Sequence, residues 1–247
     1  AGVRRLEKYL GTIARKAVVR LLKGEAAPIR VKASDVEDYL GKIIFQKERR
    51  KTGVGKVTGL AWTAMGGATL SIEATRIHTY SRGLKLTGQL GDVMRESAEA
   101  SLSWVRANAE ALGLDPATLT DGEIHLHVPA GAIPKDGPSA GVALITSLVS
   151  LLRRECADGR VAATGEISLR GRVLPVGGIK MKVLAAHRAG LSTVILPERN
   201  KRDLDQVPEE VRASLRIVLV DRIEQVLEVA LASPAAVPED TAKRAPP

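Results

Sequence analysis

Cysteine is almost absent from this chain of 247 residues, which contains only Cys156. A single cysteine cannot form an internal disulfide, and it cannot supply a cysteine-rich metal site. No bound metal is therefore expected. A chain without disulfides fits a reducing compartment, so we expect a cytoplasmic protein.

Aromatic residues and long apolar runs are scarce as well. The chain has two Trp, three Tyr and one Phe, so its core must be built mainly from Leu, Val, Ile and Ala. No segment approaches the roughly 18 consecutive apolar residues of a membrane span. The first residues, AGVRRLEKYL, also lack the apolar stretch of a signal peptide, so we expect no association with a membrane.

Positive charge is in excess, with a formal net charge of +9. Such an excess favours nucleic acid or an acidic protein as a partner. The basic residues are spread along the chain, however, and six aromatic residues offer few platforms for stacking bases. A basic nucleic-acid-binding module without catalysis remains one alternative function, and non-specific binding of DNA remains open.

Two helices are predicted at the N-terminal end. Apolar residues recur every three or four positions from Val3 to Leu21, which predicts an amphipathic helix that ends near Gly24. Ser34 and Glu37 match the Ser-x-x-Glu pattern of a capping box and predict the start of a second helix. The charged stretch at 46–51 predicts a linker, so the first domain is placed at residues 1–50.

The rest of the chain alternates between strand and helix patterns, which predicts an α/β or α+β fold. Asp92 is expected to cap the first of these helices. The main domain is expected at 51–232, and the segment 233–247, rich in Pro, Ala and charge, is expected to be a disordered tail. Strands are predicted at 57–61, 68–76, 84–88, 124–128, 161–164, 193–196 and 217–220, a hairpin at 167–173, and helices at 92–112, 139–152, 181–189 and 223–232.

The segment PKDGPSAG at 134–141 is the first candidate for chemistry, because an apolar run follows it at once. Pro138 suits the first position of a helix, which places Ser139 in the first turn. Unbonded N–H groups and the positive end of the helix dipole would there stabilise an oxyanion beside the hydroxyl. Serine is also a common residue at the start of a helix, so this position alone leaves structure and catalysis open.

The sequence pattern also leaves open which residue is the base that would activate Ser139. The same segment matches Gly-x-Ser-x-Gly, the signature of Ser-Asp-His hydrolases, but His187 is the only later histidine and a loop, not a strand, precedes the serine. A lysine with a lowered pKa is the other choice. Lys180 and Lys182 both lie in the first turn of a predicted helix, although both could equally be solvated surface residues.

Other polar residues lie at the ends or on the faces of predicted strands. His125 and His127 are two positions apart and share one face, but no third ligand accompanies them. We therefore expect packing or hydrogen bonding rather than metal binding. Thr164 ends a strand, where its hydroxyl could orient a lysine or merely terminate the strand.

Three segments together resemble the proteolytic domain of ATP-dependent Lon proteases of the bacterial type: PKDGPSAG, TGEISLRGRVLPVGGIKMKVLAAHRAG and NKRDL. The resemblance covers about residues 55–232. It implies a mixed sheet with packed helices and a serine endopeptidase with a Ser-Lys dyad. In that family the serine of the first motif works with the second lysine of Gly-Gly-x-Lys-x-Lys, which implies Ser139 as nucleophile and Lys182 as base.

The resemblance also implies supporting roles. Thr164 would hydrogen-bond the lysine, and Asp136 and Gly137 would lie on the loop that gates the nucleophile and shapes the oxyanion pocket. His125 and His127 match family positions that lie near the site but outside the dyad.

Residues 1–48 resemble the end of the helical subdomain of the family's AAA+ ATPase module. The AGVR motif implies that Arg4 senses nucleotide in the full-length enzyme. No nucleotide-binding loop is in this chain, so we expect no cofactor here, and ATP with Mg only in the full-length enzyme. The implied partners are further copies in a homohexamer and unfolded or damaged polypeptides, of which this chain alone would cleave only peptides or unfolded chains.

Overall fold

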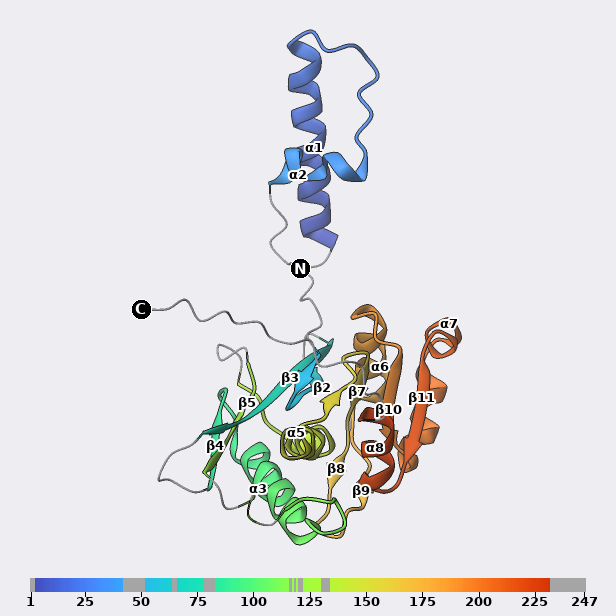
Figure 1. Cartoon of the computed structure of the whole chain (residues 1–247). Helices are drawn as coiled ribbons and strands as arrows, with labels where there is room; N and C mark the ends of the chain where they lie inside the picture. Colours follow the sequence, from blue (N-terminus) through green and yellow to red (C-terminus); the bar gives the residue numbers. More distant parts are fainter. Residues whose placement is uncertain are drawn as a thin grey trace, which may run out of the picture. The chain divides into compact units, whose positions relative to one another are not determined.

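The chain forms two units, Ala1–Arg49 and Arg50–Pro247, in a computed structural model (Figure 1). The structure describes residues 3–41, 52–63, 66–77, 83–115, 117, 119, 122–129 and 134–231. The predicted linker at 46–51 and the predicted tail at 233–247 lie outside the described residues.

The first unit consists of helix α1 (Val3–Leu22), a short 3₁₀ turn η1 (Ala33–Asp35) and helix α2 (Val36–Leu40). Arg20 of α1 donates a hydrogen bond to the buried Tyr39 hydroxyl at 2.6 Å and lies over its ring. The predicted Ser34–Glu37 capping box is wrong. The carboxylate of Asp35 instead accepts from the backbone N–H of Lys32 at 2.9 Å, because the chain turns two residues earlier than expected.

The second unit is built on a mixed sheet of seven strands, in the order β11-β10-β7-β2-β3-β5-β4. Strand β2 pairs antiparallel with β3, and β3 pairs antiparallel with β5. The other neighbours pair in parallel, which confirms the α/β class with a mixed sheet. The strands are β2 (Lys56–Thr63), β3 (Gly66–Ile77), β4 (Gly83–Thr87), β5 (Glu123–His127), β7 (Val161–Ala163), β10 (Thr193–Pro197) and β11 (Arg216–Val220).

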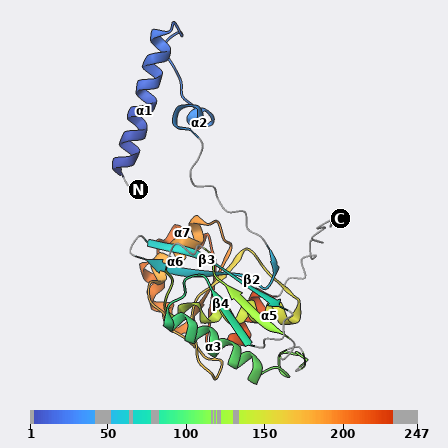
Figure 2. The ribbon, with the colours of Figure 1, turned by 90° about the vertical axis from the view of Figure 1, so that its left-hand side faces the viewer.

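Helices cover both faces of this sheet (Figure 1, Figure 2). Helices α3 (Asp92–Ala107), α5 (Gly141–Arg153) and α8 (Ile223–Ala230) form one hydrophobic core with the sheet. Helix α6 (Ile179–Arg188), the 3₁₀ segment η3 (Glu198–Gln206) and helix α7 (Glu209–Ala213) form a second core. Successive residues of β10 alternate between them, since Val194 and Leu196 enter the second core and Ile195 the first.

Helix α3 differs from the prediction at both ends. Its N-cap is Gly91 and not Asp92, and a carboxylate from a distant segment, that of Asp136, accepts the N–H of Met94 at 3.0 Å. The helix ends at Ala107 rather than near Leu112. Asn108 donates its side-chain amide to the carbonyl of Trp104 at 2.8 Å and so competes for a carbonyl near the end of the helix.

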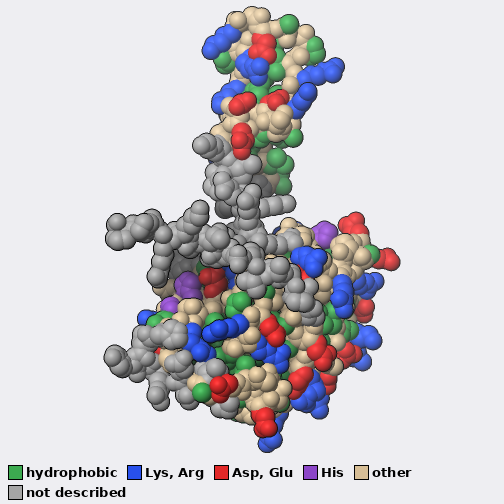
Figure 3. Space-filling view, viewed as in Figure 1, with side chains coloured by type: hydrophobic (Ala, Val, Ile, Leu, Met, Phe, Trp, Pro, Cys, Tyr) green, Lys and Arg blue, Asp and Glu red, His purple; other side chains and the backbone are tan. Residues whose placement is uncertain are grey.

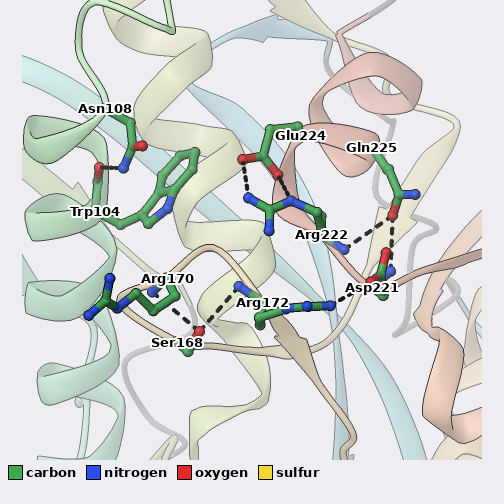
Figure 4. Close-up of polar contacts among 9 residues, drawn as sticks. All are labelled: Trp104, Asn108, Ser168, Arg170, Arg172, Asp221, Arg222, Glu224 and Gln225. Carbon is green, nitrogen blue, oxygen red and sulfur yellow. Dashed lines mark hydrogen bonds and ion pairs between the residues drawn. The ribbon is translucent and has the colours of Figure 1, made fainter.

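Two small ladders complete the unit. Strand β1 (Gly53–Val54) pairs with β6 (Cys156–Ala157), and β8 (Glu166–Ile167) pairs with β9 (Val173–Leu174). The β8–β9 hairpin turns at Gly171, as predicted, and is tied to the start of α8 by an ion pair of 2.8 Å between Arg172 and Asp221 (Figure 4). This hairpin leads from Thr164, which directly follows β7, towards α6, which carries Lys182.

Candidate active site

Ser139 lies in the 3₁₀ turn η2 (Pro138–Ala140), directly before the buried helix α5. The chain enters this turn through Gly137, whose φ of 114° is one that side chains rarely adopt. Ser139 is half-buried, as expected for a residue at the edge of the core. In the part of the chain that the structure describes, the N–H group of Ser139 donates to no protein acceptor, so it is available to a ligand.

Lys182 lies in the first turn of α6, and its side chain is only 2% exposed. The helix opens at Gly178, which has a φ of 73°, and the N–H of Lys182 makes one of the first helical hydrogen bonds, to the Gly178 carbonyl at 3.0 Å. Lys180, two positions earlier, is exposed. The two lysines therefore face different surroundings, as their spacing predicts.

A hydroxyl links the lysine to the serine. Lys182 Nζ donates to Thr164 Oγ1 at 3.0 Å, and Thr164 Oγ1 donates to the backbone carbonyl of Ser139 at 3.0 Å. A hydroxyl has one proton, so a threonine that donates to the carbonyl can only accept from the amine. The Gly165 N–H binds the same carbonyl at 3.0 Å. Three separate elements, η2, the end of β7 and α6, thus meet at this point.

Burial sets the protonation state of this lysine. Removal of the amine from water lowers the pKa of Lys182 to about 8 from an ordinary 10.5. A neutral amine has one lone pair and two protons, and one of those protons is donated in the hydrogen bond to Thr164. The lone pair is then free to accept a proton from another hydroxyl. Among the described residues no hydrogen bond yet joins Nζ to Ser139 Oγ.

An open cleft of about 390 Å³ lies beside Ser139. Its walls are residues 60–63 of β2, residues 68–70 of β3, Met94 of α3, and the segment 134–140 without Pro138. Most of this lining is apolar, and it includes the Trp62 side chain, whose residue is 62% exposed. A strand-lined apolar cleft beside a serine suits an extended chain with an apolar side chain.

Asp136 anchors the segment that precedes the serine. Its Oδ1 accepts the N–H of Met94 at 3.0 Å and that of Gly137 at 2.8 Å. Gly91 leaves the room for this contact, because a Cβ at that position would lie 2.4 Å from the Asp136 carboxyl carbon. Lys135 Nζ donates to the Gly88 carbonyl at 2.7 Å. The loop is therefore fastened to the start of α3 and to the end of β4.

The two strand histidines share a partner on the neighbouring strand. Thr87 Oγ1 lies 2.8 Å from His125 Nε2 and 2.6 Å from His127 Nδ1. The hydroxyl can donate to only one ring, so the other ring donates to it. Burial lowers the pKa of His125, with smaller contributions from Lys85 and His127. Neither histidine is among the residues described as lining the cleft, and the described residues hold no group of three or more His, Cys, Asp or Glu that could bind a metal.

His187 does not join Ser139 in the described structure. Its Nδ1 lies 2.9 Å from Ser214 Oγ, and that hydroxyl donates to the Val211 carbonyl at 2.8 Å. The triad that would make a Ser-Asp-His hydrolase is therefore not assembled. Arg4 lies on α1 in the first unit and is exposed.

Two residues that hold the lysine's helix were given no role from the sequence. Asn200 is buried against the backbone of Val176, and Gly67 lies where a Cβ would come within 1.9 Å of the Met181 carbonyl oxygen. Asn200 belongs to the motif NKRDL, and Gly67 to a Gly-Gly pair at the start of a strand. The motif and the glycine pair mark these two residues in the sequence, but neither pattern predicts which residues they contact.

The positive charge does not gather on the face that Figure 3 presents. There the Lys and Arg side chains of the second unit are interspersed with Asp and Glu. Several basic side chains are also paired, among them Arg160 with Asp158 and Arg222 with Glu224. This pattern gives no support to a nucleic-acid surface there. No helix among the described residues is long and apolar enough to cross a bilayer.

Comparison with known proteins gives concordant matches. The sequence model described as the Lon protease (S16) C-terminal proteolytic domain matches residues 30–233. Lon protease 1 of Herpetosiphon aurantiacus is 51% identical over 246 residues, which are 97% of this chain and 30% of that protein. Lon protease 1 of Bacillus subtilis is 49% identical over 233 residues, which are 94% of this chain and 30% of that protein. The chain thus spans about a third of the length of these curated relatives.

Proposed function

Because the chain belongs to the family of Lon protease (S16) C-terminal proteolytic domains, we propose that it is a serine endopeptidase with Ser139 as nucleophile and Lys182 as general base. The observation that carries the assignment of roles is the buried lysine. Its pKa is lowered to about 8, and Thr164 accepts a hydrogen bond from it while donating one to the Ser139 backbone carbonyl.

The reaction follows from these groups. Neutral Lys182 takes the proton from Ser139 Oγ as the oxygen attacks a peptide carbonyl. The N–H group of Ser139 is the candidate donor to the oxyanion, a contribution typically worth about 3 kcal/mol for each donor. Lys182 then gives its proton to the leaving amine, and water hydrolyses the acyl-enzyme with the lysine again as base.

The substrate is proposed to be an unfolded polypeptide. A cleft of about 390 Å³ between β2, β3 and the segment before Ser139 accepts a few residues of extended chain, and a folded domain could not reach Ser139 through it. Asp136 and Gly137 would set the position of the nucleophile from their anchored loop. His125 and His127 would act only through the sheet that they stiffen.

The full-length protein is proposed to couple this peptidase to ATP hydrolysis. The relatives named Lon protease are about three times as long as this chain, and the resemblance of residues 1–48 to an ATPase subdomain supplies the link. In that setting ATP and Mg would be the cofactors, Arg4 would sense the nucleotide, and the protein would act as a homohexamer. Non-specific DNA binding remains a further possible partner interaction.

Cleavage of a fluorogenic unfolded peptide without ATP tests the dyad. Ser139→Ala and Lys182→Ala should each abolish turnover, because nucleophile and base act as a unit. Lys180→Ala is the matched control, since Lys180 is exposed and should be largely dispensable. Full activity of the Lys182→Ala variant would contradict the lysine base.

A further inference from the structure

Asn200 makes a peptide-like pair with one backbone residue. Its Oδ1 accepts the N–H of Val176 at 2.9 Å, and its Nδ2 donates to the Val176 carbonyl at 2.9 Å. Nδ2 also donates a hydrogen bond to the carboxylate of Asp203. Asn200 is 5% exposed, whereas its neighbours Arg199 and Lys201 are exposed. The side-chain amide thus pairs with the Val176 backbone as a neighbouring strand would, and η3 carries the side chain to that position.

The residue that it holds lies just before the helix of the lysine. Between Val176 and α6 stand only Gly177 and Gly178, and glycine is the residue least restricted in its backbone angles. A Cβ at Gly177 would have nothing within 4 Å, so side-chain packing does not fix that position. Gly178 lies against Trp62, since a Cβ there would come 2.9 Å from the Trp62 Cβ. Val176 directly precedes this glycine pair, and Asn200 satisfies both of its backbone polar groups.

We propose that Asn200 is a positioning residue for Lys182: by holding Val176 it fixes where α6 begins, and hence where the amine lies beside Thr164. The inference rests on the proposed function in taking Lys182 as the base. A side chain with both a donor and an acceptor is needed. Aspartate would keep the bond from the Val176 N–H, lose the donor to the carbonyl and face the carboxylate of Asp203, and leucine would keep only the volume.

If α6 loses this anchor, the amine should leave its buried place and gain water. The pKa of Lys182 should then rise from about 8 towards 10.5. The direct readout is an NMR titration of the whole chain with ¹⁵N-labelled lysine side chains, with the Lys182 signal assigned from its loss in Lys182→Arg. In Asn200→Leu the midpoint should rise by about one pH unit or more.

Kinetics provide the second readout. In Asn200→Leu, kcat for the fluorogenic peptide at pH 7.5 should fall by about tenfold, because the neutral fraction of the amine falls tenfold for each unit of pKa. KM should change by less than about twofold, because Asn200 does not line the cleft. The rising limb of the pH profile should move to higher pH by the same amount as the NMR midpoint.

The matched control is Asn108→Leu, which removes another side-chain amide that binds a backbone carbonyl, that of Trp104 at 2.8 Å, on a helix that does not carry the lysine. Its Lys182 midpoint should equal that of the parent. If Asn200→Leu does not fold, as shown by its thermal melt, Asn200→Asp takes its place, because it retains one of the two bonds to Val176 and should give a smaller shift in the same direction.

The outcomes separate the two hypotheses. A folded Asn200→Leu whose Lys182 titrates at the parent's midpoint would overturn the positioning role, even if activity falls, since a purely structural residue lowers the whole pH profile without moving it. A parent whose Lys182 titrates near 10.5 would overturn the proposed function and the positioning role together. A parent that is inert towards peptides but has a lowered midpoint leaves the NMR comparison decisive.

Discussion

The amine of Lys182 is buried, no carboxylate among the described residues shifts its pKa, and this combination governs the behaviour of the site. Burial accounts for the lowered pKa, and within the described ranges the hydrogen bond of the amine goes to a neutral hydroxyl. An acidic neighbour would have kept the lysine charged and useless as a base. The neutral environment therefore matters as much as the lysine itself.

Peptidase activity should follow the neutral form of Lys182. With a pKa of about 8, kcat/KM should rise about tenfold per pH unit below pH 7.5, reach half its maximum near pH 8 and level off above about pH 9. Initial rates with a fluorogenic peptide across pH 6 to 10, in buffers of constant ionic strength, measure this. A profile that is flat between neutral and alkaline pH would contradict the assignment.

The same burial should make the lysine a burden on stability. The unfolded chain binds a proton on Lys182 up to about pH 10.5 and the folded chain only up to about pH 8, so stability rises with pH across that window. Lys182→Met should raise the free energy of unfolding at pH 7 by about 1 to 3 kcal/mol, a gain that disappears above about pH 10.5. Urea titrations at pH 7 and pH 10.5 measure the difference.

Lys180→Met is the control for that comparison, because Lys180 is exposed and its loss should change the unfolding free energy by less than about 0.5 kcal/mol. Equal effects of the two substitutions would mean that the burial of Lys182 carries no penalty.

At this scale the sequence predicts the candidate residues without showing what surrounds them in the fold. The position of Ser139 before an apolar helix followed from Pro138 and the run after it, and the structure places it in such a turn. The choice between Lys180 and Lys182 came from the resemblance alone. Burial distinguishes them only once α6 is packed on the sheet, and the contact between Asn200 and Val176 spans 24 positions that no local pattern connects.

Strand β3 and helix α6 approach each other closely at Gly67. This contact lies within α6, whereas Asn200 binds the chain just before the helix begins. A Cβ at Gly67 would lie 1.9 Å from the Met181 carbonyl oxygen and 3.1 Å from the Ala185 Cβ. The Gly67 carbonyl also accepts a hydrogen bond from Arg188 at 2.9 Å. The helix that carries the lysine thus rests directly on the backbone of the strand.

Gly67→Ala should therefore push α6 away from β3. We expect a loss of about 1 to 3 kcal/mol in unfolding free energy. The peptidase rate should also fall by about tenfold or more, because displacements of about 1 Å are costly in catalysis. Gly177→Ala is the matched control, since its Cβ would meet nothing within 4 Å and its φ is not in the left-handed region. A Gly67→Ala variant as stable and active as the Gly177→Ala variant would contradict the close contact.

Elements were predicted well where a periodic apolar pattern coincided with burial, and poorly where a polar side chain decided the boundary. Helix α5 was recognised because it is apolar nearly all round, and 11 of its 13 residues are buried. The start of helix α3 was misassigned because the N–H of Met94 binds Asp136, 42 positions away, and its end was misassigned because Asn108 binds the Trp104 carbonyl. The short elements η3 and α7 escaped prediction because their segment is largely polar and buries few residues, among them Leu204 and Val211.

The two units differ in how much of their apolar surface is covered. Helix α1 has no buried residue, and several of its apolar side chains are strongly exposed, including Val3 and Leu22 at 81% each. A helix of 20 residues without a packed face is marginal in water. Under the proposed coupling to an ATPase module, we expect that the apolar face of α1 packs on further parts of that module.

Hydrogen exchange of the whole chain should therefore reveal two stabilities in one molecule. Amides of α5 should exchange only through global unfolding, because the helix is buried on all sides between α3, α8 and the sheet. Amides of α1 should exchange faster by a factor of about 10³ or more, since α1 has no buried residue and its opening exposes little buried surface beyond Tyr39. Mass spectrometry of peptides covering 3–22 and 141–153, over times from seconds to a day, measures both. Slow exchange in α1 would show that another copy or another segment already covers its apolar face, and the proposal that α1 lacks its partner in this chain would then fail.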